Sequence, residues 1–224
     1  MRNTLPHLEV ESALFAEGFA TVGALDEVGR GSAFGPCSVG LVVIDFTAGT
    51  FPAELRDSKL LSARARERLV EPLVAWVLDY AIGHASAQEI DEFGLTAALR
   101  LAGRRALHQV SVAPDVLVLD GHHDWLSMPA DGPLLSPEYP AVDVPGVRTM
   151  IKADLTCASV AAASVLAKVQ RDRLICELAK EVPGYDLANN KGYATAAHLA
   201  ALRELGPSRY HRVSWKLPAR VAAS

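Results

Sequence analysis

The sequence predicts an α/β fold in which helices lie on the faces of a mixed β-sheet. Two apolar segments near the start, residues 19–27 and 37–45, are joined by a glycine-rich turn and indicate an antiparallel pair of strands. Farther on, helical and extended patterns alternate, and residues 115–120 (DVLVLD) contain an uninterrupted apolar run. Strands first, followed by alternating helices and strands, are typical of a mixed sheet covered by helices.

After the first two strands the chain predicts one long helix, one short strand and a second long helix. A helix over 62–78 has a serine cap and apolar residues at helical spacing, and it contains Pro72, which can kink it. A strand over 80–86 follows. A helix over 87–110 comes next and is punctuated by glycines.

The second half of the chain repeats the alternation. The apolar run of 115–120 predicts a strand that is covered on both faces. Residues 122–146 are polar and proline-rich, which indicates an irregular loop, and a short strand over 147–152 follows. A long helix over 156–180 has almost only small residues in its first half, and a last helix over 195–205 begins at a threonine cap.

The composition fits one cytoplasmic domain. A chain of 224 residues, 50% of them hydrophobic, can bury one sizeable core, so we expect a single domain over 1–224 with a core of about 18–205 and a basic C-terminal segment over 206–224. Its three cysteines lack the spacing of a disulfide framework or a zinc site, which indicates reduced thiols. No apolar run reaches the length of about 18 residues that a membrane span needs. Nothing indicates an oligomer, so we expect a monomer.

The charge distribution points to nucleic acid although the net charge is -4. Phosphate contacts are short-ranged at cellular salt, so local charge matters more than the sum. The basic residues near the end of the chain are Lys191, Arg203, Arg209, Arg212, Lys216 and Arg220. Among them we expect Arg212 and Lys216 to contact duplex phosphates. Arg100, Arg104 and Arg105 form a second group, for which a solvated helix face is the alternative.

Four carboxylates stand at the ends of predicted strands or just past them: Asp26, Glu27, Asp120 and Asp154. Acids that converge on one point cannot all stay ionised without a cation, and oxygen ligands suit Mg²⁺ or Mn²⁺. Such a site can hold two ions that act on a phosphodiester. Taken singly, Asp26 and Glu27 also fit a solvated turn, Asp120 fits a turn before Gly121, and Asp154 fits the acidic start of a helix.

Strand geometry raises a difficulty for the first two acids. Neighbours on a strand point to opposite faces, so Asp26 and Glu27 cannot both aim at one point from regular geometry. We therefore expect the strand to end or bulge at Glu27, or one of the two residues to bind through its backbone carbonyl or through a water molecule.

Two further features suit recognition of a sugar. Gly29, Arg30 and Gly31 form a turn that exposes bare backbone beside the acids, and such backbone can approach a sugar hydroxyl, the group that distinguishes RNA from DNA. Tyr193 lies between Gly192 and a helix start, where its ring could stack on a sugar or base. The alternative for this tyrosine is simple packing against the helix N-terminus.

Six motifs together resemble bacterial ribonuclease HII, in the order of that family and over nearly the whole chain. They are GALDEVGRG (23–31), DSKLLS (57–62), VLVLDG (116–121), IKADLTCASVAAASVLAKVQRD (151–172), NKGYATAAH (190–198) and GPSRYHRVSW (206–215). The resemblance implies a ribonuclease H-like fold, a mixed sheet of about five strands flanked by helices with a helical C-terminal part. It also implies endonucleolytic cleavage of RNA in RNA–DNA hybrids and of single ribonucleotides embedded in duplex DNA, leaving 3′-hydroxyl and 5′-phosphate ends.

The resemblance also implies roles for particular residues. Asp26, Glu27, Asp120 and Asp154 match the acids that bind the catalytic divalent metal, Mn²⁺ or Mg²⁺. Gly29, Arg30 and Gly31 match the turn that senses the 2′-hydroxyl, and Tyr193 matches the tyrosine that stacks on the deoxyribose at the RNA–DNA junction. Lys59 of the DSK motif is expected near the substrate phosphate.

The sequence departs from the family pattern after Asp120, where His122 and His123 replace the usual residues and the stretch to Asp154 is long. We expect an inserted loop there, and we interpret His122, His123 and Asp124 as exposed rather than as metal ligands. Two other functions remain open at this stage. One is a glycosidase that uses a carboxylate pair without a metal, and the other is a hybrid-binding module without catalysis.

Overall fold

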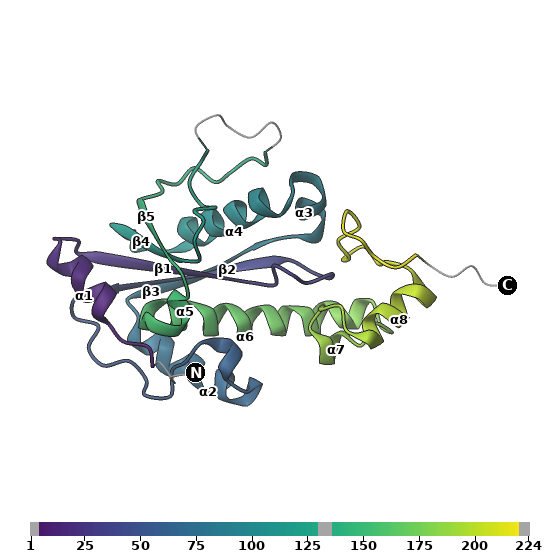
Figure 1. Ribbon diagram of the computed structural model, residues 1–224, viewed down its shortest axis with the longest axis horizontal. Coiled ribbons are helices and arrows are strands. Elements are labelled where there is room, and N and C mark those ends of the chain that lie inside the picture. Colours follow the sequence, from purple (N-terminus) through teal and green to yellow (C-terminus); the bar gives the residue numbers. More distant parts are fainter. Residues whose placement is uncertain (1–4, 130–135, 220–224) are drawn as a thin grey trace.

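A five-stranded β-sheet forms the centre of the computed structural model, which describes residues 5–129 and 136–219 (Figure 1). The strands are β1 (Thr21–Val28), β2 (Cys37–Asp45), β3 (Asp79–Ala85), β4 (Val116–Asp120) and β5 (Gly146–Met150). Across the sheet their order is β3-β2-β1-β4-β5. β2 pairs antiparallel with β1 and β3, whereas β4 pairs parallel with β1 and β5. The predicted mixed sheet, with antiparallel first strands, is therefore confirmed.

Helices cover both faces of this sheet. They are α1 (Glu9–Ala16), α2 (Ala63–Trp76), α3 (Ala87–Phe93), α4 (Leu95–Gln109), α5 (Ala153–Thr156), α6 (Ala158–Glu181), α7 (Leu187–Asn190) and α8 (Ala196–Leu205), with a 3₁₀ turn η1 (Ser58–Leu60) before α2. In Figure 1, α3 and α4 lie on one side of the sheet and α2 and α6 on the other. Val22 and Val116 pack toward α6, and Leu25 and Leu117 pack toward α4.

Most of the predicted elements are present, and the differences include two short helices, α5 and α7, that the sequence did not predict. The helix expected over 87–110 is split into α3 and α4 at Gly94, whose φ of 78° favours glycine. α2 runs through Pro72 as one helix. The sequence did not predict α1, in which the fully buried Glu11 accepts hydrogen bonds from the backbone N–H (2.9 Å) and hydroxyl (2.6 Å) of Ser159. This carboxylate stabilises the N-terminal end of α6.

The small residues of α6 let it lie directly on the sheet. A Cβ placed on Gly40 of β2 would lie 2.5 Å from the carbonyl oxygen of Ala163 and 2.9 Å from Cβ of Ala167. Such distances are too short for a real contact, so a glycine in the strand and alanines in the helix are both needed for this close approach. The helix therefore carries its side chains right up to the carboxyl end of β1.

The C-terminal part extends the sheet domain at the far end of α6, where Figure 1 shows α7 and α8. Its own small core contains Phe34, Ile175, Tyr185, Leu187 and Leu202. Phe34 comes from the chain between β1 and β2, so this core joins the C-terminal helices to the strand ends. Among the described residues, no helix is long and apolar enough to cross a membrane. The three cysteines are free, as expected.

Candidate active site

Asp26 and Asp120 occupy matching positions on adjacent parallel strands. The last residues of β1 and β4 that pair with each other are Leu25 and Leu119, so the two aspartates come directly after this pair. By strand alternation both carboxylates lie on the sheet face that α6 covers. Asp26 is only 5% exposed, and its carboxylate accepts a hydrogen bond from the hydroxyl of Ser164 on α6.

Asp154 joins this group from α5, immediately after β5. The Ala153 backbone N–H donates to Oδ1 of Asp120 at 2.7 Å, which ties the start of α5 to the end of β4. Asp154 is buried, and Nζ of Lys59 donates to its Oδ2 at 2.8 Å. Lys59 reaches this position from η1, where the carboxylate of Asp57 accepts from the Lys59 backbone N–H at 3.0 Å.

Glu27 reaches the same place without any irregularity of β1. The antiparallel register with β2 continues through Glu27 and Val28, so the expected strand end or bulge at Glu27 is wrong. The reason is that the parallel pairing of β1 with β4 stops at Leu25, which leaves the following edge of β1 open. At an open strand edge, side chains from both faces of the sheet can enter the same cavity. Asp26 and Glu27 both line such a cavity.

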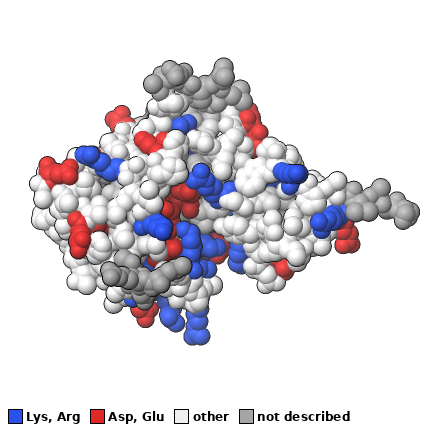
Figure 2. Space-filling view, viewed as in Figure 1, with Lys and Arg blue, Asp and Glu red and all other residues white. Residues whose placement is uncertain are grey.

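This cavity has a volume of about 230 Å³ and collects most of the predicted site residues. Its lining residues are Asp26, Glu27, Val28, Gly29, Arg30, Gly31, Ser58, Lys59, Asp120, Ser164, Lys168 and Tyr193. Asp154 is not among them, but it contacts the cavity through Lys59. Figure 2 shows acidic and basic side chains side by side near the middle of the face drawn there.

Three carboxylates of the cavity have raised pKa values although Lys59, Arg30 and Lys168 lie beside them. Burial, with smaller contributions from Glu27 and Asp120, raises the pKa of Asp26 to about 8. Burial also raises the pKa of Glu27, although its Oε1 accepts a hydrogen bond from Arg30 at 3.1 Å. The pKa of Asp120 is raised by burial and by the nearby Asp154. Burial alone would lower the pKa of Lys59, but its contacts with Asp154 and Asp57 raise it.

These carboxylates fit a hard divalent cation. Oε2 of Glu27 is buried and has no hydrogen-bond partner, and it belongs to a cavity whose acidic groups have raised pKa values. Within residues 5–129 and 136–219 no three His, Cys, Asp or Glu side chains are already arranged around one metal position. Lys59, Arg30 and the Ala153 N–H each hold a carboxylate oxygen of this group. The donor set, made only of oxygen, is that of Mg²⁺ or Mn²⁺.

The turn at Gly29, Arg30 and Gly31 is held from behind by two buried arginines that the sequence did not single out for this role. Arg212 donates to the carbonyl oxygens of Gly29 (2.7 Å) and Arg30 (3.0 Å). A Cβ on Gly29, which has a φ of 80°, would lie 2.1 Å from Nε of Arg171. Both arginines are fully buried. The only sequence signal for Arg171 was a charged residue on the buried side of a helix rich in small residues.

The expectation that Arg212 contacts duplex phosphates is wrong, because its guanidinium is buried among backbone carbonyls. Lys216 is exposed, and Arg220 lies outside the described residues. In the second basic group, Arg100 is buried and donates to the Ser127 carbonyl at 3.0 Å, and Arg105 pairs with Glu89 at 2.7 Å. Arg100 therefore does not form part of a solvated helix face, whereas Arg105 is partly exposed.

Tyr193 lines the cavity. Tyr193 is 37% exposed. Nζ of Lys168 lies 5.9 Å from the centroid of its ring, and Cζ of Arg171 lies 5.7 Å from it. The Gly192 carbonyl accepts from the Ala33 backbone N–H at 3.0 Å, which fixes this turn beside the chain that follows Gly31. The structure thus brings Tyr193 and the glycine turn to one opening.

The histidines after Asp120 lie outside this site. His122 and His123 are exposed, and Oδ1 of Asp124 accepts from the backbone N–H of Leu126 at 2.9 Å. They belong to the described part of the irregular loop predicted for 122–146, which contains no helix or strand over 121–129 and 136–145.

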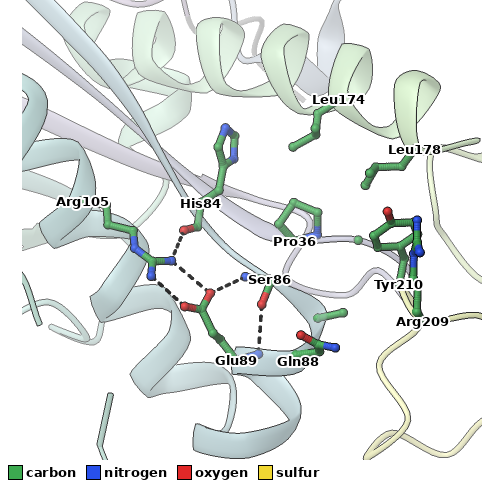
Figure 3. A pocket seen from close by; sticks show the side chains of 12 residues that line it. Pro36, His84, Ser86, Gln88, Glu89, Arg105, Leu174, Leu178, Arg209 and Tyr210 are labelled. Atoms are coloured by element: carbon green, nitrogen blue, oxygen red, sulfur yellow. Dashed lines mark hydrogen bonds and ion pairs between the residues drawn. The ribbon is translucent and has the colours of Figure 1, made fainter. Parts of the chain in front are cut away.

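A second cavity, of about 490 Å³, lies on the other side of Gly35 and Pro36 (Figure 3). Leu174, Leu178 and Pro36 give it a largely apolar wall. Arg105 pairs with Glu89 inside the cavity, and Arg209, which also lines it, pairs with Glu181. A cavity without free carboxylates or cations offers nothing to a phosphodiester, so the carboxylate cavity is the candidate active site.

Comparisons with known proteins agree with this assignment. The model of the family described as Ribonuclease HII matches residues 23–218. The Ribonuclease HII of Streptomyces avermitilis is 46% identical over 211 residues, which are 94% of this chain and 83% of that protein. The crystal structure of ribonuclease H2 from Pyrococcus horikoshii OT3 superposes with a TM-score of 0.65 at 25% identity, covering 88% of this chain and 94% of that one.

A crystal structure of Bst-RNase HIII in complex with Mn²⁺ shares the fold, with a TM-score of 0.61 at 21% identity over 87% of this chain and 66% of that chain. The fold is therefore ribonuclease H-like, as the motifs implied. Enzymes of this kind depend on divalent metal ions. A glycosidase and a hybrid-binding module without catalysis are not favoured, because the family match extends over nearly the whole chain. The chain belongs to the ribonuclease HII family and is an endoribonuclease that acts on RNA–DNA hybrids.

Proposed function

We propose that this enzyme cleaves both long RNA–DNA hybrids and single ribonucleotides embedded in duplex DNA, leaving 3′-hydroxyl and 5′-phosphate ends. The observation that carries the proposal is the shared cavity, in which Asp26, Glu27 and Asp120 lie together with the glycine turn and Tyr193. We also propose that 1–224 acts as a single domain, with a catalytic core over about 18–205 and the C-terminal segment 206–224 attached to it.

Asp26, Glu27, Asp120 and Asp154 are the proposed metal ligands. When bound, two divalent ions would activate the attacking water and stabilise the charge on the leaving oxygen. Binding requires these carboxylates to be ionised, so Asp26 must give up a proton and Lys59 and Arg30 must release the oxygens that they hold. Either Mg²⁺ or Mn²⁺ suits ligands of this kind, and we propose that both support cleavage.

The remaining residues of the opening would recognise the substrate. The backbone of Gly29, Arg30 and Gly31 can approach the 2′-hydroxyl because the glycines have no side chains to block it. The half-exposed ring of Tyr193 can stack on the deoxyribose that follows a ribonucleotide. Lys59, freed from Asp154, can contact the scissile phosphate.

Isosteric removal of single carboxylates tests the metal assignment. Asp26→Asn and Asp120→Asn keep the shape of the side chain and remove its charge, so we expect each to lower Mn²⁺-dependent cleavage by about 100-fold or more. Cleavage of a long hybrid and of a duplex with one ribonucleotide is measured with Mg²⁺, with Mn²⁺ and with EDTA. EDTA should abolish both activities of the wild-type enzyme.

Asp143→Asn is the matched control, because Asp143 is exposed and lies outside the cavity. This variant should cut at the wild-type rate. A near wild-type rate for Asp26→Asn or Asp120→Asn would contradict the metal assignment. Cleavage of the hybrid without cleavage at the lone ribonucleotide would contradict the proposed second substrate and leave the metal assignment standing.

A further inference from the structure

Two buried histidines are joined side by side in the C-terminal part, and the proposed chemistry uses neither of them. His198 lies on α8 and His211 lies in the chain after it, and their Nε2 atoms are 3.0 Å apart. His198 is fully buried and His211 is 2% exposed. The rings of Phe34 and Tyr185 enclose His211, with centroid distances of 5.0 and 4.7 Å.

The groups at the two ends of this pair dictate which nitrogen atoms carry hydrogen. Nδ1 of His198 lies 2.9 Å from the Tyr193 carbonyl oxygen, which can only accept, so this nitrogen must donate. Nδ1 of His211 accepts from the Ser208 backbone N–H at 2.9 Å, and that group can only donate. Both rings are then neutral with opposite tautomers, and Nε2–H of His211 donates to Nε2 of His198. The chain of hydrogen bonds runs in one direction.

The same histidine pair lies between the two substrate-facing elements. At one end His198 holds the carbonyl of Tyr193. At the other end His211 forms a β-bridge with Phe34, and the next residue, Arg212, donates to the carbonyls of Gly29 and Arg30. The turn that would read the 2′-hydroxyl and the tyrosine that would read the adjacent deoxyribose are therefore linked through this pair, in addition to the direct hydrogen bond from the Ala33 N–H to the Gly192 carbonyl.

We propose that His198 and His211 are positioning residues that set Tyr193 against the Gly29–Gly31 turn, and that they thereby favour substrates with a junction between one ribonucleotide and the following deoxyribonucleotide. This inference rests on the proposed role of Tyr193. Loss of the pair loosens the tyrosine but leaves the carboxylates in place. Cleavage at a lone ribonucleotide, which has only one productive register, therefore falls more than cleavage of a long hybrid.

The ratio of the two cleavage rates measures this effect. His211→Leu removes the donor to His198 and leaves a buried acceptor unpaired, and we expect the ratio of lone-ribonucleotide to hybrid cleavage to fall about tenfold. His211→Gln keeps an N–H donor near the position of Nε2 and should restore the ratio to within about threefold of the wild type. His108→Ala, at an exposed histidine of α4, is the control and should leave the ratio unchanged.

The Tyr193→Ala background shows whether the histidines act through the tyrosine. If they do, the double variant Tyr193→Ala/His211→Leu has the same ratio as Tyr193→Ala, because the group being positioned is already gone. An additional fall in the ratio would overturn the inference, and so would an unchanged ratio in the folded His211→Leu variant. An unchanged ratio in Tyr193→Ala itself would instead contradict the proposed role of Tyr193, and the inference would fall with it.

Nitrogen NMR of the wild-type imidazoles provides a test that needs no variant. The expected spectrum shows His198 protonated only at Nδ1 and His211 protonated only at Nε2. The low pKa of His211, about 4, which burial and the neighbouring His198 cause, agrees with a neutral ring. The opposite tautomers, or a charged ring, would break the directed chain and overturn the inference even if every His211 variant failed to fold.

Discussion

Asp26 shows at the scale of one residue how a site can be prepared for a cation. Its carboxylate is enclosed by Ser164, Glu27 and Asp120, and burial raises its pKa to about 8. A buried acid with such a pKa is protonated at neutral pH in the absence of a metal ion. The proton neutralises the carboxylate until a divalent ion binds and displaces it. Metal binding and deprotonation of Asp26 are therefore coupled.

This coupling predicts the pH dependence of stability in EDTA. The pKa of Asp26 is about 8 in the folded protein and 3.8 in the unfolded chain, so the folded state binds more protons between these values. The free energy of unfolding of the metal-free enzyme should therefore fall as the pH rises from about 4 to about 8. Asp26→Asn has no proton to lose, so at pH 8.5 it should be more stable than the wild type.

Thermal unfolding at several pH values, with and without Mn²⁺, provides the measurement. Saturating Mn²⁺ should raise the Tm of the wild type at pH 8.5 and leave that of Asp26→Asn almost unchanged, because a ligand stabilises only the state that binds it. Parallel pH profiles for the two proteins in EDTA would show that Asp26 is not the titrating group.

At the scale of elements, the contact between α6 and the sheet decides where the catalytic side chains lie. Ser164 and Lys168 of α6 line the cavity, and Asp26 pairs in register with Gly40 of β2. Gly40 lies directly beneath Ala163, so a close contact between α6 and the sheet is one strand away from Asp26. A side chain added at Gly40 therefore changes the site without touching it.

Gly40→Ala should destabilise the protein and slow cleavage. The new Cβ would lie 2.5 Å from the Ala163 carbonyl oxygen, so α6 must move away from the sheet, which we expect to cost about 2 kcal/mol. Gly146→Ala on β5 is the control, since nothing lies within 4 Å of its new Cβ, and it should stay within about 0.5 kcal/mol of the wild type. Urea unfolding and hybrid cleavage measure the two effects. Equal stability of the two variants would contradict the close packing.

At the scale of the whole molecule, acidic and basic groups meet around one opening although the net charge is -4. Lys59, Arg30 and Lys168 all line the carboxylate cavity. The basic composition of the C-terminal segment predicted phosphate contacts for both Arg212 and Lys216. In the structure Arg212 is buried behind the glycine turn, whereas Lys216 is exposed. Arg212 therefore contributes to stability, whereas Lys216, four positions later, contributes to the surface charge.

These two residues should respond in opposite ways to substitution. Arg212→Met removes the guanidinium that donates to the carbonyl oxygens of Gly29, Arg30 and Gly35, so it should lower the free energy of unfolding by about 3 kcal/mol and leave the salt dependence of duplex binding unchanged. Lys216→Ala should leave stability unchanged and reduce the salt slope by about one. Binding is measured with Ca²⁺ in place of the catalytic metal. A lower salt slope for a folded Arg212→Met would return this residue to the nucleic-acid interface.

Local patterns were enough to predict the strands and the carboxylates at their ends. Alternation and apolar runs indicated the strands that became β1, β2 and β4, and the acids that follow them could be read directly from the chain. Gly94 was visible as a helix breaker, but whether a glycine ends a helix depends on the φ that the fold imposes, and Gly103 in the same pattern stays inside α4. Arg171 is buried by segments that are distant in the sequence, and burial of this kind leaves no periodic pattern along the chain.

By itself, the sequence determined the mixed sheet, the order of its elements, the membership in the ribonuclease HII family and the oxygen-rich character of the site, because these depend on residue type and on spacing along the chain. Only the tertiary structure decided how Glu27 joins Asp26, which arginines support the glycine turn, and that His198 and His211 meet. Each of these contacts joins segments whose separation in space is set by packing. An open strand edge or a buried hydrogen bond exists only once its neighbours are in place.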